Sequence, residues 1–277
     1  MVRPAPRARR GGGVVSDGLD GRIAFVTGAS GDLGRAIAEG LAAAGADVVV
    51  HCRADAARGD AVVAACRRLG RRAVAVAGDV ADPVAMAAAR DAGIAALGAA
   101  PDIVVANAVS QIPWLSVEDQ PLADFLDQFR TCVLHAAVAA KTFLPAMRAR
   151  RWGRIVGIST ECVIECRAGS SAYAAGKGGM DRLLRCLANE VAAAGITVNQ
   201  VAPGWMISAR NRRPGGSEDE DGAAPDALAG YLAGVPMGHR GSDGDIADAV
   251  VFLASDRARF ITGTLVPVCG GRATTSI

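Results

Sequence analysis

The chain has 277 residues, of which 51% are hydrophobic and 21% are charged, and its formal net charge is +2. The apolar content excludes a disordered polymer, and the balanced charge excludes the overall basic field that nucleic-acid binding requires. This length fits one or two domains, and a single α/β domain of this size is ordinary. Seven cysteines without a C-x-x-C pair argue against a disulfide framework or a zinc site.

The first residues are basic, rich in proline and glycine, and free of the apolar segment that a secretory signal carries. We expect residues 1–18 to form a flexible basic tail and residues 19–277 to form the folded domain. No apolar run reaches the ~20 residues of a membrane span. These features predict a cytoplasmic protein that binds neither membranes nor nucleic acid, and no metal site is expected.

Short runs rich in valine and isoleucine alternate with longer alanine-rich stretches of helical character. Such apolar strands indicate a sheet covered on both faces, and the strand–helix alternation predicts one Rossmann-like, doubly wound parallel sheet of about seven strands. In chain order, the expected strands are Arg22–Thr27, Asp47–Cys52, Ala73–Ala77, Ile103–Ala106, Arg154–Ile158, Thr197–Ala202 and Thr264–Val268. The expected helices are Leu33–Ala44, Asp55–Leu69, Pro83–Leu97, Leu122–Arg150, Tyr173–Ala194 and Asp243–Ser255.

The segment from Gly204 to Arg240 interrupts this alternation with several arginines, a Pro-Gly-Gly sequence and an acidic run over Glu218–Asp221. Long irregular segments inside a compact domain are usually lids or binding loops. A solvated insertion fits the charged middle equally well. We expect a lid or substrate loop over about residues 204–240.

A glycine-rich turn with the sequence TGASGDLG lies between the first expected strand and the first expected helix. In that position, backbone N–H groups and the helix dipole can meet the pyrophosphate of a dinucleotide. Asp32 could cap the helix, or its carboxylate could repel the phosphates. The candidate nucleotide-contacting residues of the turn are Gly28, Ser30, Gly31, Asp32, Leu33 and Gly34.

The end of the second expected strand bears on the choice of nucleotide. An acidic residue at this point would hydrogen-bond the ribose hydroxyls of NAD, whereas a basic residue suits the 2′-phosphate of NADP. Arg53, with His51 nearby, therefore favours NADP(H), and NAD(H) stays open as the alternative. In a chain so rich in arginine, Arg53 could also be an ordinary exposed side chain.

Tyr173 and Lys177 stand four residues apart on an expected helix and therefore share one face. A neighbouring ammonium favours the phenolate, so that the tyrosine can exchange a proton with an alcohol or ketone oxygen. With the glycine turn, this pair resembles the classical short-chain dehydrogenase/reductase family over the region from Gly21 to Gly271. The glycine spacing departs from that branch, which has glycine where this chain has Asp32.

The resemblance implies further site residues. Thr160 precedes Tyr173 by 13 residues and takes the place of the family's catalytic serine, with Ser159 as the alternative. Cys132 takes the place of an asparagine that anchors a proton-relay water, and a thiol is a weak substitute for an amide. The residues that resemble the family's other nucleotide contacts are Asp79 and Val80 near adenine, Asn107 and Ala108 after the fourth strand, and Pro203, Gly204 and Ser208 near the nicotinamide.

The loops that follow the strands are also expected to form the substrate pocket, from Gln111, Trp114, Cys132, Cys162 and Trp205. Two tryptophans in a chain with few aromatic residues suggest an apolar or aromatic small-molecule substrate. The C-terminal segments Phe260–Gly263 and Val268–Gly271 resemble those of family members that form homotetramers or homodimers.

These features together predict an NADP(H)-dependent ketone reductase that uses Tyr173 as general acid. The sequence is similar to 3-oxoacyl-acyl-carrier-protein reductases and to ketoreductases of specialised metabolism. Two alternatives stay open. One is an NAD-dependent alcohol dehydrogenase. The other is an atypical member with weak or non-redox activity, which the departures at Asp32, Cys132 and Thr160 would explain.

Overall fold

The computed structural model describes residues 18–54, 56–207 and 225–273, and these form a seven-stranded parallel sheet in the order β3-β2-β1-β4-β5-β6-β7. The predicted Rossmann-like sheet is confirmed, and each strand begins and ends within one residue of its expected bounds. The strands are β1 (Ile23–Val26), β2 (Asp47–Cys52), β3 (Ala73–Ala77), β4 (Ile103–Ala106), β5 (Gly153–Ile158), β6 (Ile196–Pro203) and β7 (Leu265–Val268).

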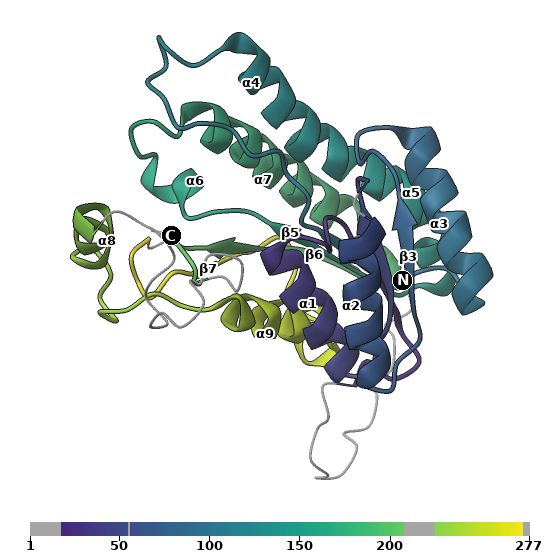
Figure 1. Ribbon diagram of the computed structural model, residues 1–277. Coiled ribbons are helices and arrows are strands. Elements are labelled where there is room, and N and C mark those ends of the chain that lie inside the picture. The colour runs from purple at the N-terminus through teal and green to yellow at the C-terminus, as the bar shows by residue number, and fades with distance from the viewer. Residues whose placement is uncertain (1–17, 55, 208–224, 274–277) are drawn as a thin grey trace.

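Helices cover both faces of the sheet (Figure 1). Because neighbouring side chains of a strand point to opposite faces, Val26 joins one apolar cluster and Phe25 the other. The first cluster packs against α1 (Asp32–Ala43), α2 (Ala56–Arg68) and α9 (Asp243–Ala254). The second packs against α3 (Pro83–Leu97), α5 (His135–Arg150) and α7 (Ser171–Val191), and there the ring of Phe25 lies 4.8 Å from that of Phe143.

The single long helix expected over Leu122–Arg150 is wrong in one respect, because a π-helical turn divides it. The three parts are α4 (Leu122–Gln128), the π-helix η1 (Phe129–Leu134) and α5. In the wide turn the His135 N–H reaches back to the Arg130 carbonyl, and the His135 ring nitrogen Nδ1 lies 3.2 Å from the Thr131 carbonyl. Such π-turns occur frequently at functional sites.

Two short helices were not expected: α6 (Cys162–Glu165), and α8 (Pro225–Leu232) within the predicted lid segment. Short 3₁₀ turns, η2 (Ala192–Ala194) and η3 (Asp256–Ala258), follow α7 and α9. Residues 1–17 of the predicted tail lie outside the described residues, as do residues 208–224 of the predicted lid, Ser208 among them. Within the described ranges, no helix is long and apolar enough to cross a bilayer, and no cluster of three or more His, Cys, Asp or Glu residues could hold a metal ion.

Candidate active site

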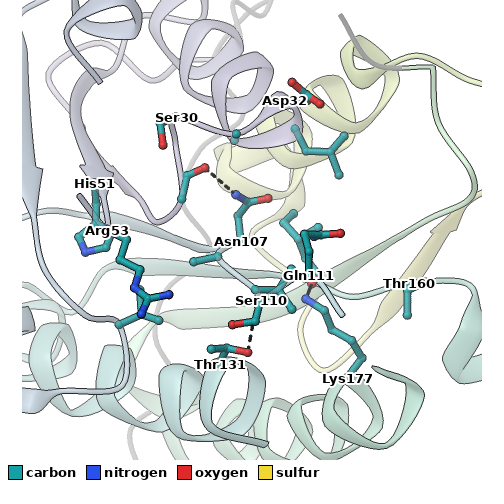
Figure 2. Close-up of a pocket in the computed structure, with 18 of the residues that line it drawn as sticks. Ser30, Asp32, His51, Arg53, Asn107, Ser110, Gln111, Thr131, Thr160 and Lys177 are labelled. Carbon is teal, nitrogen blue, oxygen red and sulfur yellow. Dashed lines mark hydrogen bonds between the residues drawn. The ribbon is translucent and has the colours of Figure 1, made fainter. Parts of the chain in front are cut away.

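A cavity of about 1040 Å³ lies where the strand order reverses, between β1 and β4, at the carboxyl ends of the strands. This is the edge at which doubly wound sheets bind ligands. Its wall contains every predicted nucleotide-contacting residue except Ser208, together with Thr160 and Gln111. Figure 2 shows Ser30, His51 and Arg53 toward one end of the cavity and Thr160 and Lys177 toward the other.

The glycine turn after β1 is held by the Asn107 side chain. Its amide nitrogen donates to the carbonyls of Thr27 (2.9 Å) and Gly28 (3.3 Å), as Figure 2 shows in part. Gly28 has a φ of +62°, a conformation that glycine adopts readily. A Cβ on Gly34 would lie 2.2 Å from the Gly28 carbonyl oxygen, so a side chain at this position would force the turn and α1 apart. The unusual glycine spacing therefore still produces a tight strand–helix turn.

The structure corrects the predicted capping role of Asp32. Gly31 is the N-cap of α1, it provides no side-chain cap, and Asp32 is the first helical residue. Asp32, Leu33 and Gly34, which begin the helix, line the cavity. Amides at a helix N-terminus suit the pyrophosphate of a dinucleotide, whereas the Asp32 carboxylate on the same wall opposes an anion.

Basic side chains surround the end of the cavity that contains Arg53, called the adenosine end because the predicted adenine contacts lie there. Arg53 lies there with Arg58 and Arg130, two arginines that the sequence reasoning missed, and with Asp79. Partial burial raises the pKa of Asp79, but the Ala81 amide at 2.9 Å and the ion pair with Arg130 outweigh burial and lower it. Only the tertiary fold could reveal Arg130, because it reaches Asp79 from η1, 51 residues further along the chain.

His51 lies at the same end and is neutral, because burial lowers its pKa to about 4. The charge at this end of the cavity therefore comes from the arginines and from Asp79.

Thr160, Tyr173 and Lys177 meet at the other end of the cavity. The Thr160 hydroxyl lies beside Tyr173 and accepts a hydrogen bond from the Cys162 amide at 3.2 Å. Lys177 is only 1% exposed, and its Nζ donates to the Ile158 carbonyl at 2.6 Å and lies 6.0 Å from the centroid of the Tyr173 ring. A carbonyl oxygen placed near Tyr173 could thus meet both hydroxyl groups.

The pKa of Tyr173 is raised, whereas the sequence predicted that the neighbouring Lys177 would lower it. Burial raises the pKa of Tyr173, and the thiols of Cys162 and Cys132 raise it further, more than the Thr160 hydroxyl lowers it. Burial also lowers the pKa of Lys177. Tyr173 is therefore a protonated phenol at neutral pH, which is the state of a general acid.

The predicted substrate residues divide into two groups. Gln111 lines the cavity. Trp114 is not one of the lining residues, but its half-exposed ring lies 6.1 Å from that of Tyr173, which lines the cavity. The other three do not line it either. Cys132 and Cys162 are buried beside Tyr173, and Trp205 packs edge-on against the Tyr231 ring at 5.3 Å. Sequence position alone did not show which way these three side chains point.

Comparison with known proteins decides the family. The family model described as "Enoyl-(Acyl carrier protein) reductase" matches residues 28–273. The chain belongs to the short-chain dehydrogenase/reductase family. It is an oxidoreductase that acts on a CH–OH or C=O group with NAD(P), which confirms the enzyme class predicted from the sequence.

Three short-chain dehydrogenase/reductases illustrate the likeness. The 3-oxoacyl-(acyl-carrier-protein) reductase FabG of Escherichia coli is 36% identical, over 91% of this chain and 98% of that protein. The cis-4-hydroxycyclohexanecarboxylate dehydrogenase of Sinomonas cyclohexanicum is also 36% identical, over 90% of this chain and 96% of its own length. A solved 7α-hydroxysteroid dehydrogenase in complex with NADH and 7-oxo-glycochenodeoxycholic acid is 29% identical, with a TM-score of 0.83 over 92% of this chain and 96% of its own.

Proposed function

We propose that this enzyme reduces a ketone to a secondary alcohol and uses NADPH. The observation that carries the proposal is the protonated Tyr173, which lies beside Thr160 and Lys177 on the wall of the same cavity as the glycine turn. Reduction needs a proton donor, and a phenol with a raised pKa holds its proton throughout the neutral range. The same tyrosine would serve as the base for alcohol oxidation only at more alkaline pH.

The side chains divide the work of the reaction. When bound, the nicotinamide nucleotide supplies the hydride that the carbonyl carbon gains. The Thr160 hydroxyl donates a hydrogen bond that polarises the carbonyl oxygen, and Tyr173 transfers its proton to that oxygen as the alkoxide develops. Lys177, as a buried cation, stabilises the phenolate left on Tyr173 and holds the ribose beside it.

The preference for NADPH follows from the charge at the adenosine end. Arg53, Arg58 and Arg130 line that end against the carboxylate of Asp79, which Arg130 already neutralises. The planar guanidinium group suits bidentate binding of a phosphate. A 2′-phosphate would find several guanidinium donors at this end, whereas a ribose without that phosphate carries no anion for them to bind.

The substrate is proposed to be an apolar or aromatic ketone, since Trp114 forms an apolar wall beside Tyr173. Its neighbours Leu115 and Val117 are exposed apolar residues of the same loop. Such a wall fits the ketoreductases of specialised metabolism, and it also accommodates the alicyclic ring named for one of the relatives. All seven cysteines are free thiols, which supports a reducing, cytoplasmic location.

Titration of the protein with NADPH and NADH, followed by nicotinamide fluorescence, tests the nucleotide preference. We expect tighter binding of NADPH. Arg53→Ala should raise the Kd for NADPH by about tenfold or more, because a hydrogen bond to a charged group contributes roughly 1.5–3 kcal/mol, and should leave the Kd for NADH unchanged. Arg90→Ala, which removes a surface partner of Asp91 on α3, is the matched control. Tighter binding of NADH by the wild type would contradict the proposal.

The direction of the reaction is tested by following NADPH absorbance against a panel of cyclic, aromatic and linear ketones, with the matching alcohols and NADP as the reverse reaction. We expect reduction at an even rate across the neutral range and oxidation that increases with pH. Oxidation at neutral pH that exceeds reduction would favour an alcohol dehydrogenase. Nucleotide binding without turnover of any compound would favour the atypical member.

A further inference from the structure

Charged side chains that the proposed mechanism does not use meet behind Thr160. Glu161 follows Thr160 directly, is only 1% exposed, and pairs with Arg167. Glu165 on α6 pairs with both Arg167 (2.7 Å) and Arg272 (3.1 Å). Two carboxylates and two guanidinium groups therefore balance in charge, and they link the loop after β5 to the segment after β7.

Tyr231, on α8, lies in the middle of this network. Its hydroxyl donates to a Glu161 carboxylate oxygen at 3.3 Å and accepts a hydrogen bond from the Trp205 amide at 2.7 Å. The guanidinium of Arg272 lies 4.6 Å from the ring centroid and donates to the Tyr231 carbonyl at 2.7 Å. Figure 1 shows α8 beside the carboxyl end of β7, away from the main layers of helices.

The Tyr231 hydroxyl joins two loops that both contribute residues to the cavity wall. The loop after β5 holds Thr160, which meets the substrate oxygen, and the loop after β6 holds Gly204, which lines the cavity at the end expected for the nicotinamide. The loops also share a backbone bond, from the Glu161 amide to the Pro203 carbonyl at 2.9 Å. A Cβ on Gly204 would lie 2.6 Å from the Tyr231 hydroxyl, so glycine is what lets the hydroxyl approach.

We propose that Glu161 and Tyr231 are positioning residues: the Tyr231 hydroxyl ties the Glu161 carboxylate to the Trp205 amide, and docking of α8 thereby fixes the Thr160 loop relative to the Gly204 turn. This inference rests on the proposed function for its catalytic consequence. The bridge sets the distance between the Thr160 hydroxyl, which polarises the carbonyl, and the expected nicotinamide site, from which the hydride comes. Helix α8 is in this way connected to the active site through one buried side chain.

Tyr231→Phe tests the bridge with little other change, because the ring and its contacts with Trp205 and Arg272 remain. We expect kcat to fall by about tenfold to a hundredfold, the effect of a displacement of up to about 1 Å in a reacting geometry, with an unchanged Kd for NADPH. Asp256→Asn is the control, since it takes a carboxylate from the buried Arg154 at the other end of β5. That variant should lose thermal stability and keep its kcat.

Glu161→Gln provides a second readout. Burial raises the pKa of Glu161, in surroundings that comprise Arg167, Glu165, Tyr231 and Arg272. As the pH falls toward this raised pKa, the carboxylate gains a proton and its ion pair with Arg167 weakens. With saturating NADPH, the wild-type kcat should therefore decrease as the pH becomes more acidic. Residue 161 of the variant carries no charge at any pH, so its kcat should not show this decrease.

Hydrogen exchange separates this inference from the proposed function, because it needs no substrate. Amides of residues 159–163 and 204–207 should exchange faster in Tyr231→Phe than in the wild type and should be unchanged in Asp256→Asn. Equal exchange in Tyr231→Phe and wild type would overturn the bridge even if no ketone were turned over. A wild-type kcat in Tyr231→Phe, or an equal fall in Asp256→Asn, would overturn it as well.

Discussion

Lys177 illustrates at the scale of one residue how catalysis and stability oppose each other. Only two of the 30 basic residues of this chain are lysines, and Lys177 is one of them. It is buried, its Nζ has a backbone carbonyl as hydrogen-bond acceptor, and burial lowers its pKa. Arginine would be bulkier and would stay protonated, so it could not supply the same compact ammonium beside Tyr173. The cost is a charged group removed from water without a carboxylate partner among the residues that the structure describes.

Lys177→Met should therefore abolish measurable ketone reduction and raise the Tm by about 2–4 °C, the shift that corresponds to 1 kcal/mol in a chain of this size. The stability of the wild type should also depend on pH. Because the folded-state pKa of Lys177 is below its ordinary value of 10.5, the unfolded state binds more protons between these two values, and stability rises with pH there. Differential scanning calorimetry at several alkaline pH values should show this slope in the wild type and its loss in the variant. A lower Tm for Lys177→Met would contradict this account.

At the scale of an element, the π-helix η1 contributes residues to both ends of the cavity. Its six residues place Arg130 against Asp79 at the adenosine end and Cys132 beside Tyr173 and Lys177 at the catalytic end. Cys132 stands where the resemblance to the family places an asparagine, and its thiol donates to the Gln128 amide oxygen at 3.9 Å. A thiol anchors a water molecule weakly, so proton return to Lys177 is expected to be slower than with an amide.

Cys132→Asn should therefore raise kcat for ketone reduction severalfold with little change in the Kd for NADPH. The two side chains are similar in volume, and the new amide can donate to Gln128. Steady-state kinetics in H₂O and D₂O would show whether proton delivery has become faster, since the solvent isotope effect on kcat should decrease. A lower kcat at an unchanged Tm would mean that the thiol is the better group at this site.

At the scale of the whole molecule, the sheet and its covering helices could be predicted because the strands are apolar runs separated by alanine-rich helices. The glycine turn and the Tyr173–Lys177 pair could be placed because both depend on local spacing. The rest depended on tertiary structure. Arg130 reaches Asp79 only through the fold, the side-chain directions of Cys132, Cys162 and Trp205 follow from packing, and burial reverses the expected pKa shift of Tyr173.

The π-turn was missed for a further reason at this scale. One wide turn hardly changes the hydrophobic periodicity of a long helix. The sequence could therefore only predict one continuous helix over Leu122–Arg150. The helix α8 was missed because the charged segment before it interrupts the pattern from which helices are predicted.

The assembly of whole molecules gives a further prediction. Leu122, Leu126 and Phe129 follow one another along α4 and into η1 at helical spacing and are 81%, 72% and 50% exposed. We propose that a second copy of the chain covers this apolar face in a homodimer or homotetramer. Leu126→Glu should shift the mass measured by light scattering toward that of the monomer, whereas Val84→Glu, at a comparably exposed position on α3, should not. An unchanged mass in Leu126→Glu would place any oligomer interface elsewhere.

The central claim is that Tyr173 is the acid that protonates the substrate oxygen, and Tyr173→Phe tests it most directly. The variant keeps the ring beside Trp114 and loses only the hydroxyl. With any ketone that the wild type reduces, kcat/KM should fall by about 10²–10⁴-fold, the usual contribution of a positioned general acid, while the Kd for NADPH stays the same. A Tyr173→Phe enzyme that reduces the ketone at the wild-type rate would contradict the account.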